Sequence, residues 1–152
     1  MEEINIKDLV PLIEEVIESG TNFRLFPKGT SMNPYIIEGE DSVILTKPID
    51  LKIYDAVLYK RDNDQYVLHR IVAEHGDYFD MCGDNQFYYE KNVKKSSVIA
   101  KVTGIYKKDE LIDVSSVKYR NDIERFYHKK SFKIFLYKIK RLIYPIYKTI
   151  FK

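Results

Sequence analysis

Residues 66–74 read YVLHRIVAE, and this stretch decides the fold class. Successive side chains of a β-strand point to opposite faces, so Val67, His69 and Ile71 share one face of the predicted strand. Because β-branched residues flank it on that face, His69 is expected to be half-buried and held in one orientation.

Similar short apolar stretches lie on both sides of residues 66–74. The predicted strands are 21–27, 41–45, 55–60, 66–74, 78–82, 98–106 and 111–114. Turn-forming residues separate them, at 38–39, 62–64, 75–77 and 83–85. Short strands at this spacing predict a mainly β fold, a coiled, antiparallel and partly closed sheet.

A helix is predicted at each end of the chain. Residues 8–19 place their apolar side chains on one stripe, with Asp8 as the N-cap, Pro11 in the first turn and Gly20 ending the helix. Residues 121–151 form a longer helix, in which Pro145 is expected to introduce a kink or to end the regular part. The predicted apolar face of this helix consists of Phe132, Phe135, Leu136, Ile139, Leu142, Ile143, Ile146, Tyr147 and Ile150.

Charge divides the chain into two predicted parts. The 152 residues include 25 Lys and Arg and 23 Asp and Glu. Nine of the Lys and Arg residues and none of the Asp and Glu residues lie in residues 125–152. The first 124 residues therefore contain 16 basic and 23 acidic side chains, a net charge of −7. We therefore predict an acidic globular domain at 1–122, with a motif core at 23–106, and a basic amphipathic helical tail at 123–152.

Composition also narrows the function classes. The single cysteine excludes an internal disulfide framework and a multi-cysteine zinc site, and no metal or cofactor is expected. No apolar run reaches the roughly 18 residues of a membrane helix, and no signal peptide is visible. The expected location is the cytoplasm.

Residues 28–34 read KGTSMNP and could carry a nucleophile. A serine attacks a carbonyl only when a base removes its proton and hydrogen-bond donors stabilise the oxyanion. A turn that contains glycine could aim the backbone N–H groups of Thr30 and Ser31 at one point, which would form an oxyanion hole. The alternative is an ordinary turn without catalytic function.

His69 and two acidic residues could supply the rest of a catalytic site. Histidine has an unperturbed pKa of about 6.5, which suits a general base near neutral pH. Asp84, in the GDN stretch at 83–85, or Glu90 could orient His69 as the third member of a triad. The alternatives are a core histidine with satisfied hydrogen bonds and a simple β-turn.

Taken together, these motifs resemble the signal peptidase I superfamily, which also contains the self-cleaving domains of LexA-type repressors. The ordered motifs are GxSMxP at 29–34, EGxDxV at 38–43, YDAVLYK at 54–60, LHRIV at 68–72 and GDN at 83–85. The resemblance covers roughly residues 23–106.

The resemblance implies a role for each motif residue. Ser31 matches the nucleophile, and His69 matches the base of the endoplasmic-reticulum and archaeal type, in which arginine follows the histidine. Asp84 matches the aspartate of the GDN motif, and Glu90 stands where the eukaryotic type has a second aspartate, so either carboxylate could support His69. Gly29 replaces a serine of many signal peptidases, which leaves backbone N–H groups as the oxyanion donors.

The implied activity is that of a serine endopeptidase. Such enzymes cleave a leader or signal-like segment from a peptide or protein by Ser-His acyl-enzyme chemistry. Their substrate binds as an extended strand along a sheet edge, with small residues before the scissile bond. Two alternatives are a non-catalytic module on the same scaffold that binds a peptide or partner, and a LexA-type self-cleaving regulator. The second is disfavoured because too few residues precede the first strand for a DNA-binding domain.

The basic segment 125–152 departs from the family pattern, in which a transmembrane anchor is usual. Its lysines and arginines lie largely apart from its apolar face, which suits a helix in the interface of an anionic membrane, here the inner membrane surface. The equal alternative is that the apolar face packs on the body or on a second copy. Nucleic-acid binding is not expected, and the sequence leaves the oligomeric state open.

Overall fold

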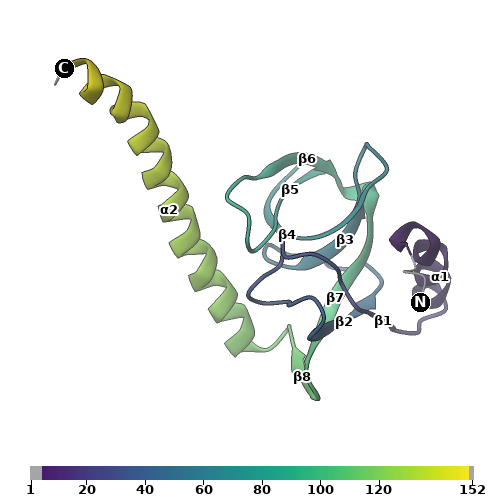
Figure 1. The fold of residues 1–152 in the computed structure, drawn as a ribbon. Coiled ribbons are helices and arrows are strands. Elements are labelled where there is room, and N and C mark those ends of the chain that lie inside the picture. Colours follow the sequence, from purple (N-terminus) through teal and green to yellow (C-terminus); the bar gives the residue numbers. More distant parts are fainter. Residues whose placement is uncertain (1–4, 151–152) are drawn as a thin grey trace. The chain divides into compact units, whose positions relative to one another are not determined.

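The computed structural model describes residues 5–150, with their side chains as far as Pro145. The chain is mainly β: in sequence order, an N-terminal helix precedes the eight strands of one antiparallel sheet, and a C-terminal helix follows them (Figure 1). The elements are α1 (Ile6–Glu18), β1 (Phe23–Leu25), β2 (Asp41–Thr46), β3 (Ala56–Lys60), β4 (Tyr66–His75), β5 (Tyr78–Cys82), β6 (Glu90–Lys94), a 3-10 turn (Lys95–Ser97), β7 (Val98–Lys107), β8 (Glu110–Asp113) and α2 (Val117–Ile150). Residues 1–116 and 117–152 form two compact units.

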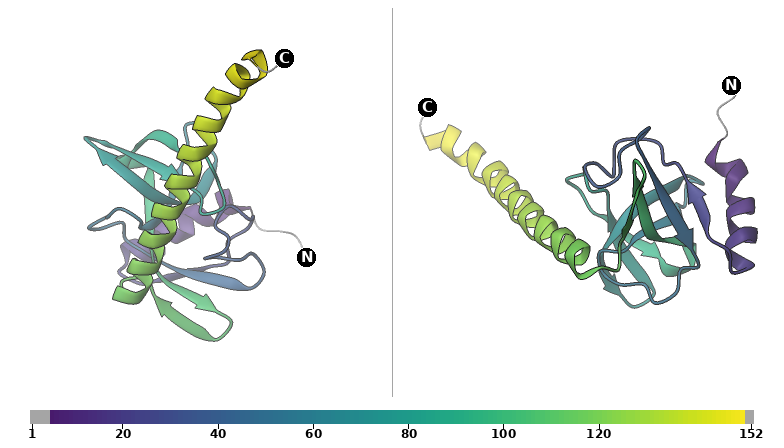
Figure 2. Two further views of the ribbon diagram at one scale, coloured as in Figure 1. Left: turned by 90° about the vertical axis from the view of Figure 1, so that its left-hand side faces the viewer. Right: turned by 90° about the horizontal axis from the view of Figure 1, so that it is seen from below.

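The sheet confirms the predicted mainly β, antiparallel fold, but it is not closed. Its strands follow the order β1-β2-β7-β3-β4-β5-β6, and β8 pairs with β7. Within the described residues no pairing joins β1 to β6, so these two strands are edges. Register shifts in the β2–β7, β3–β7, β4–β5 and β5–β6 pairs bend the strands, and Figure 2 shows the sheet curling on itself.

Strand β7 joins two halves of the sheet. The β1–β2 half pairs with β7 through β2, and the β3–β4–β5–β6 half pairs with β7 through β3. The loop with Ser31 connects β1 to β2, whereas His69 lies on β4. The two main candidate residues therefore belong to different halves.

The face of β4 that carries His69 lies against the main apolar core, as the alternation predicts. Ile71 is fully buried and belongs to the core cluster, and Val67 packs against that cluster. Val57 and Tyr59 of β3 lie opposite His69 and Val67. His69 itself is 1% exposed, so its burial is deeper than the half-burial predicted.

Helix α1 begins earlier than the sequence pattern indicates. Asn5 is its N-cap, and the Oδ1 of Asn5 accepts a hydrogen bond from the Lys7 N–H at 3.0 Å. Asp8 therefore lies within the first turn instead of capping the helix, and Pro11 lies inside the helix beyond that turn. The predicted end is confirmed, because Gly20 follows the C-cap with a φ of +84°, in the left-handed region that favours glycine.

Helix α2 runs without a break from Val117 to Ile150 and starts before the predicted helix start at 121. Pro145 lies inside it, so the prediction that the regular part could end there is wrong. The side chains of Ile146, Tyr147 and Ile150, and all of Phe151, lie outside the described part of the chain. Among the described helices, none combines the length and the apolar character needed to cross a membrane.

Candidate active site

Ser31 lies in the loop between β1 and β2, and buried neighbours anchor this loop. Gly29 has a φ of +89°, a backbone angle that residues other than glycine rarely adopt. Met32 and Ile36 are buried beneath the loop, and the N–H of Ile36 donates to the carbonyl of Met32 at 2.9 Å. Ser31 is consequently held half-exposed between a turn that favours glycine and a buried anchor.

The GDN turn after β5 packs directly against Ser31. The N–H of Asn85 donates to the carbonyl oxygen of Ser31 at 2.8 Å. A Cβ atom on Gly83 would lie only 2.7 Å from that same oxygen, so glycine is required for this close approach. The structure thus brings the first and last predicted motifs together through their backbones.

Asp84 makes a buried ion pair with Arg70, the residue that follows His69. Its Oδ1 accepts from Nε of Arg70 at 2.9 Å, and its Oδ2 accepts from Nη2 at 2.7 Å. The side chains are 1% exposed for Arg70 and 0% for Asp84. A third guanidinium nitrogen, Nη1, donates to the carbonyl of Tyr54 at 2.9 Å. This two-pronged pairing holds the GDN turn, and Ser31 with it, against β4.

Glu90 reaches His69 through the hydroxyl of Tyr59. That hydroxyl donates to Oε2 of Glu90 at 2.8 Å and lies 3.2 Å from Nδ1 of His69. A tyrosine hydroxyl has one proton, and an ionised carboxylate can only accept, so the Tyr59 proton points to Glu90. The hydroxyl oxygen must then accept a hydrogen bond from the Nδ1–H of His69. Hydrogen bonding thus assigns the neutral imidazole to the tautomer with its proton on Nδ1 and its lone pair on Nε2.

Arg61 keeps Glu90 ionised in this network. Burial by itself would raise the pKa of Glu90, but hydrogen bonds from Arg61 and Tyr59 and the charge of Arg61 outweigh burial and lower it. Nη2 of Arg61 lies 2.6 Å from Oε2 of Glu90. Burial, followed by the hydrogen bond to Glu90, raises the pKa of Tyr59 far above its ordinary value, so its hydroxyl stays protonated.

Ser31 and His69 are not hydrogen-bonded, and His69 does not line the small cavity beside Ser31. Ser31 lines a small cavity of ≈ 80 Å³ together with Val67 and Leu68 of β4. Among the described side chains, the hydroxyl of Ser31 makes no hydrogen bond, whereas Nε2 of His69 is buried. Catalytic hydrogen bonds are often long before substrate binds.

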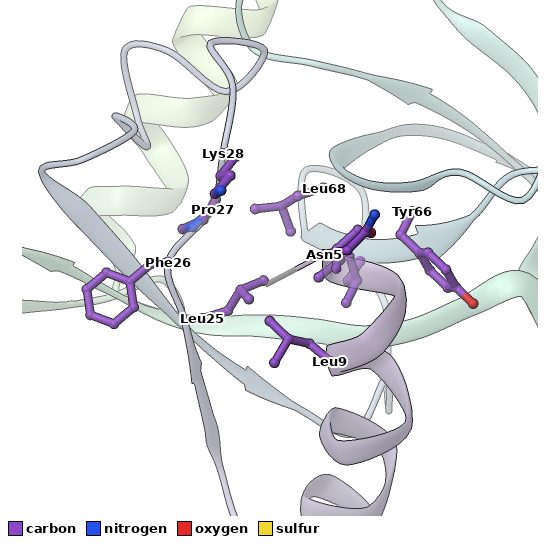
Figure 3. A pocket seen from close by; sticks show the side chains of 10 residues that line it. Asn5, Leu9, Leu25, Phe26, Pro27, Lys28, Tyr66 and Leu68 are labelled. Atoms are coloured by element: carbon purple, nitrogen blue, oxygen red, sulfur yellow. The ribbon is translucent and has the colours of Figure 1, made fainter. Parts of the chain in front are cut away.

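A larger apolar cavity adjoins the small one. Its volume is ≈ 390 Å³, and it shares Pro27, Lys28, Tyr66 and Leu68 with the cavity beside Ser31. Figure 3 shows Leu9 of α1, Leu25 of β1 and Leu68 of β4 converging on it. The start of α1 therefore forms one wall of a hollow that leads toward Ser31.

Three residues of the site were not singled out from the sequence. Arg70 carried a usable signal, because a charged residue amid the apolar strand 66–72 needs a buried partner of opposite charge. Tyr59 and Arg61 carried none, since a tyrosine in a strand and an arginine in a turn are common. The described residues contain no group of three or more His, Cys, Asp or Glu side chains that could hold a metal ion.

No protein-family model matches the chain, and neither a curated protein nor a solved structure is found that matches it.

Proposed function

We propose that the chain is a serine endopeptidase of the signal-peptidase-like type, with Ser31 as nucleophile and His69 as general base. One observation carries the proposal. The GDN turn hydrogen-bonds to the carbonyl of Ser31, and its Asp84 pairs with Arg70, next to His69. Three motifs that are distant in sequence are thereby gathered at one place, in the combination that the resemblance requires.

In the assigned tautomer of His69, the lone pair of Nε2 is the one that accepts a proton in the first chemical step. Nε2 of His69 takes the proton of the Ser31 hydroxyl as Oγ attacks the scissile carbonyl carbon. The imidazolium formed is stabilised by the Glu90 carboxylate through the Tyr59 hydroxyl. Glu90 thus supplies the acidic support left open between two candidates, while Asp84 positions the GDN turn.

The remaining steps follow the ordinary acyl-enzyme route. The backbone N–H groups of Thr30 and Ser31 stabilise the oxyanion of the tetrahedral intermediate. His69 returns its proton to the leaving amine as the peptide bond breaks, which leaves an ester on Ser31. A water molecule then loses a proton to His69 and attacks the ester, the bond to Oγ of Ser31 breaks as His69 returns that proton to Oγ, and the acyl group leaves as a carboxylic acid.

The two cavities differ in size, which supports a substrate with one small and one large side chain. An apolar cavity of about 150 Å³ holds a benzene ring, so the ≈ 80 Å³ cavity beside Ser31 suits a small side chain such as that of alanine. The ≈ 390 Å³ cavity has room for a large aliphatic or aromatic one. A leader or signal-like segment, bound as an extended strand along the β1 edge, would carry both.

The second candidate is a peptide-binding module without catalysis. It is favoured by one observation, that the Ser31 hydroxyl makes no hydrogen bond to a described side chain. A LexA-type self-cleaving regulator is the third reading, and it predicts cleavage of the chain itself instead of a separate substrate.

Covalent labelling of Ser31 tests the proposal. The native chain is treated with a β-lactam-type or peptidyl serine probe, and the mass increase is mapped by mass spectrometry. We expect Ser31→Ala to abolish labelling and His69→Gln to slow it by roughly 100- to 10,000-fold. Ser96→Ala and His128→Gln, which change exposed residues, are the matched controls. If no probe labels Ser31 in a folded chain that still binds leader peptides, the binding module is correct.

A further inference from the structure

Helix α2 carries an exposed apolar stripe along its second half. Phe132, Phe135, Leu136, Leu142 and Ile143 are between 41% and 72% exposed. With the half-exposed Ile139, they follow one another at spacings of three and four residues. At 3.6 residues per turn these six side chains occupy an arc of about 120° on the helix.

Basic side chains border this stripe on both sides. The helix geometry places Lys133 and Lys140 along one border and Lys138 along the other, and all three are exposed. No acidic residue follows Glu124 in the chain. A partner for this surface must therefore be apolar at its centre and negatively charged on both flanks.

An anionic lipid surface has this chemistry. Helices that lie in a membrane interface combine an apolar face with lysine and arginine on the polar side, and phosphate headgroups then pair with the basic residues while the acyl chains cover the apolar ones. The helix is not apolar enough to cross a membrane, which agrees with a position in the plane of the interface. A protein partner would need two acidic borders at matched spacing, whereas a lipid surface supplies charge in every direction.

We propose that the stripe formed by Phe132, Phe135, Leu136, Ile139, Leu142 and Ile143, with its flanking lysines, binds the surface of anionic membranes. The peptidase would then act beside a bilayer, on substrates that also reside there. The proposal stands on α2 alone and holds whether or not Ser31 is catalytic.

Vesicle flotation of the full chain tests the proposal. Vesicles of phosphatidylcholine alone are compared with vesicles that also contain phosphatidylglycerol, at low and at high salt. We expect binding to the phosphatidylglycerol vesicles at low salt, weakened at high salt, and little binding to phosphatidylcholine. The double variant Phe135→Gln/Leu142→Gln should lower the partition coefficient roughly 100-fold, because two apolar side chains lose their burial.

Two matched controls separate the stripe from general effects of mutation. Tyr137→Gln/Tyr144→Gln removes exposed aromatic side chains from the opposite face of α2 and should leave binding unchanged. Lys133→Gln/Lys138→Gln/Lys140→Gln should lower binding to anionic vesicles about 100-fold, whereas Lys7→Gln/Lys52→Gln/Lys94→Gln, on the other unit, should not. Circular dichroism checks that each variant keeps its helix.

Three results would overturn the proposal. The first is no binding to either vesicle, and the second is equal binding by the native chain and the stripe variant. The third is a chain that does not bind vesicles but does one of two other things. It forms an oligomer that the stripe variant converts to a monomer, or it forms a complex with duplex DNA. That result would assign the surface to a second copy of the chain or to nucleic acid.

Discussion

Asp84 and Glu90 are two carboxylates of the same region that the structure uses in different ways. Both pair with an arginine. Asp84 is fully buried and gives both oxygens to Arg70. Glu90 is 24% exposed and also accepts from an arginine, Arg61, with both oxygens, but its Oε2 accepts in addition from Tyr59. The further partner of each carboxylate therefore decides its role. A carboxylate fully engaged by an arginine holds structure, and one that also accepts from a tyrosine can act on the histidine beyond it.

The largest expected effect is on the stability of the folded chain, and it distinguishes the structural role of Asp84 from the role of Glu90. Asp84→Ala leaves the buried guanidinium of Arg70 without its counter-charge, and we expect the free energy of unfolding to fall by about 3–5 kcal/mol in urea denaturation. Asp64→Ala, which breaks the exposed pair with Lys60, should lower the stability far less, because solvent screens that pair. Equal losses in the two variants would mean that the Asp84 pair is not buried in solution.

The next effect concerns the contact between the GDN turn and Ser31. Gly83→Ala places a Cβ against the Ser31 carbonyl, so the loop must move, at a cost of about 1–3 kcal/mol in stability. Because Ser31 moves with it, labelling by the serine probe should fall at least as steeply as stability does. Gly39→Ala is the control, since a Cβ there meets nothing within 4 Å although its φ is +78°. Unchanged labelling in Gly83→Ala would remove the turn from the site.

A smaller effect tests the link from Glu90 to His69. Tyr59→Phe removes the hydroxyl between them and should slow the labelling of Ser31 about tenfold, the value of one hydrogen bond near 1.4 kcal/mol. The dependence of the labelling rate on pH should change shape as well, which a purely structural loss would not produce. Tyr78→Phe, at an exposed tyrosine on β5, should change neither quantity.

The smallest expected effect is a change in stability at acidic pH, and it concerns Glu90. The folded pKa of Glu90 is lowered from its ordinary value of 4.5, so its contribution to stability is present above that pH and disappears as the pH falls through the folded value. In urea denaturation, the native chain should therefore exceed Glu90→Gln in stability at neutral pH, and this excess should shrink below about pH 4.5. Asp62→Asn controls for loss of an exposed charge. An excess that grows in acid would contradict the sign of the shift.

Most strands of the sheet were predictable from the sequence, but β6 was not. Strand β5 has the predicted bounds, because YFDMC is strongly strand-like and flanked by turns. Strand β6 was missed since EKNVK has one apolar residue, Val93, and Asn92 has a φ of +58°. An edge strand that buries one side chain leaves almost no alternation to detect.

The site was predictable in its motifs but not in its connections. Ser31 and the GDN turn could be named, yet the need for glycine at Gly83 comes from a backbone contact across the fold. Choosing between Asp84 and Glu90 required the positions of Arg70 and Tyr59, and strand pairing sets these positions. The order of the motifs along the chain predicts which residue types the site contains. The strand register decides which of these side chains contact one another.

The central place of β7 has a consequence for the timing of synthesis. Ser31 lies in the half of the sheet that is completed early, and His69 in the next half, but strand pairing joins them only through Val98–Lys107. A chain still on the ribosome, with β7 inside the exit tunnel, has both residues but not the strand that pairs with both halves of the sheet. Pairing between segments so distant along the chain is also slow. The two halves of the sheet that carry Ser31 and His69 are therefore joined by strand pairing only after β7 has been translated and released.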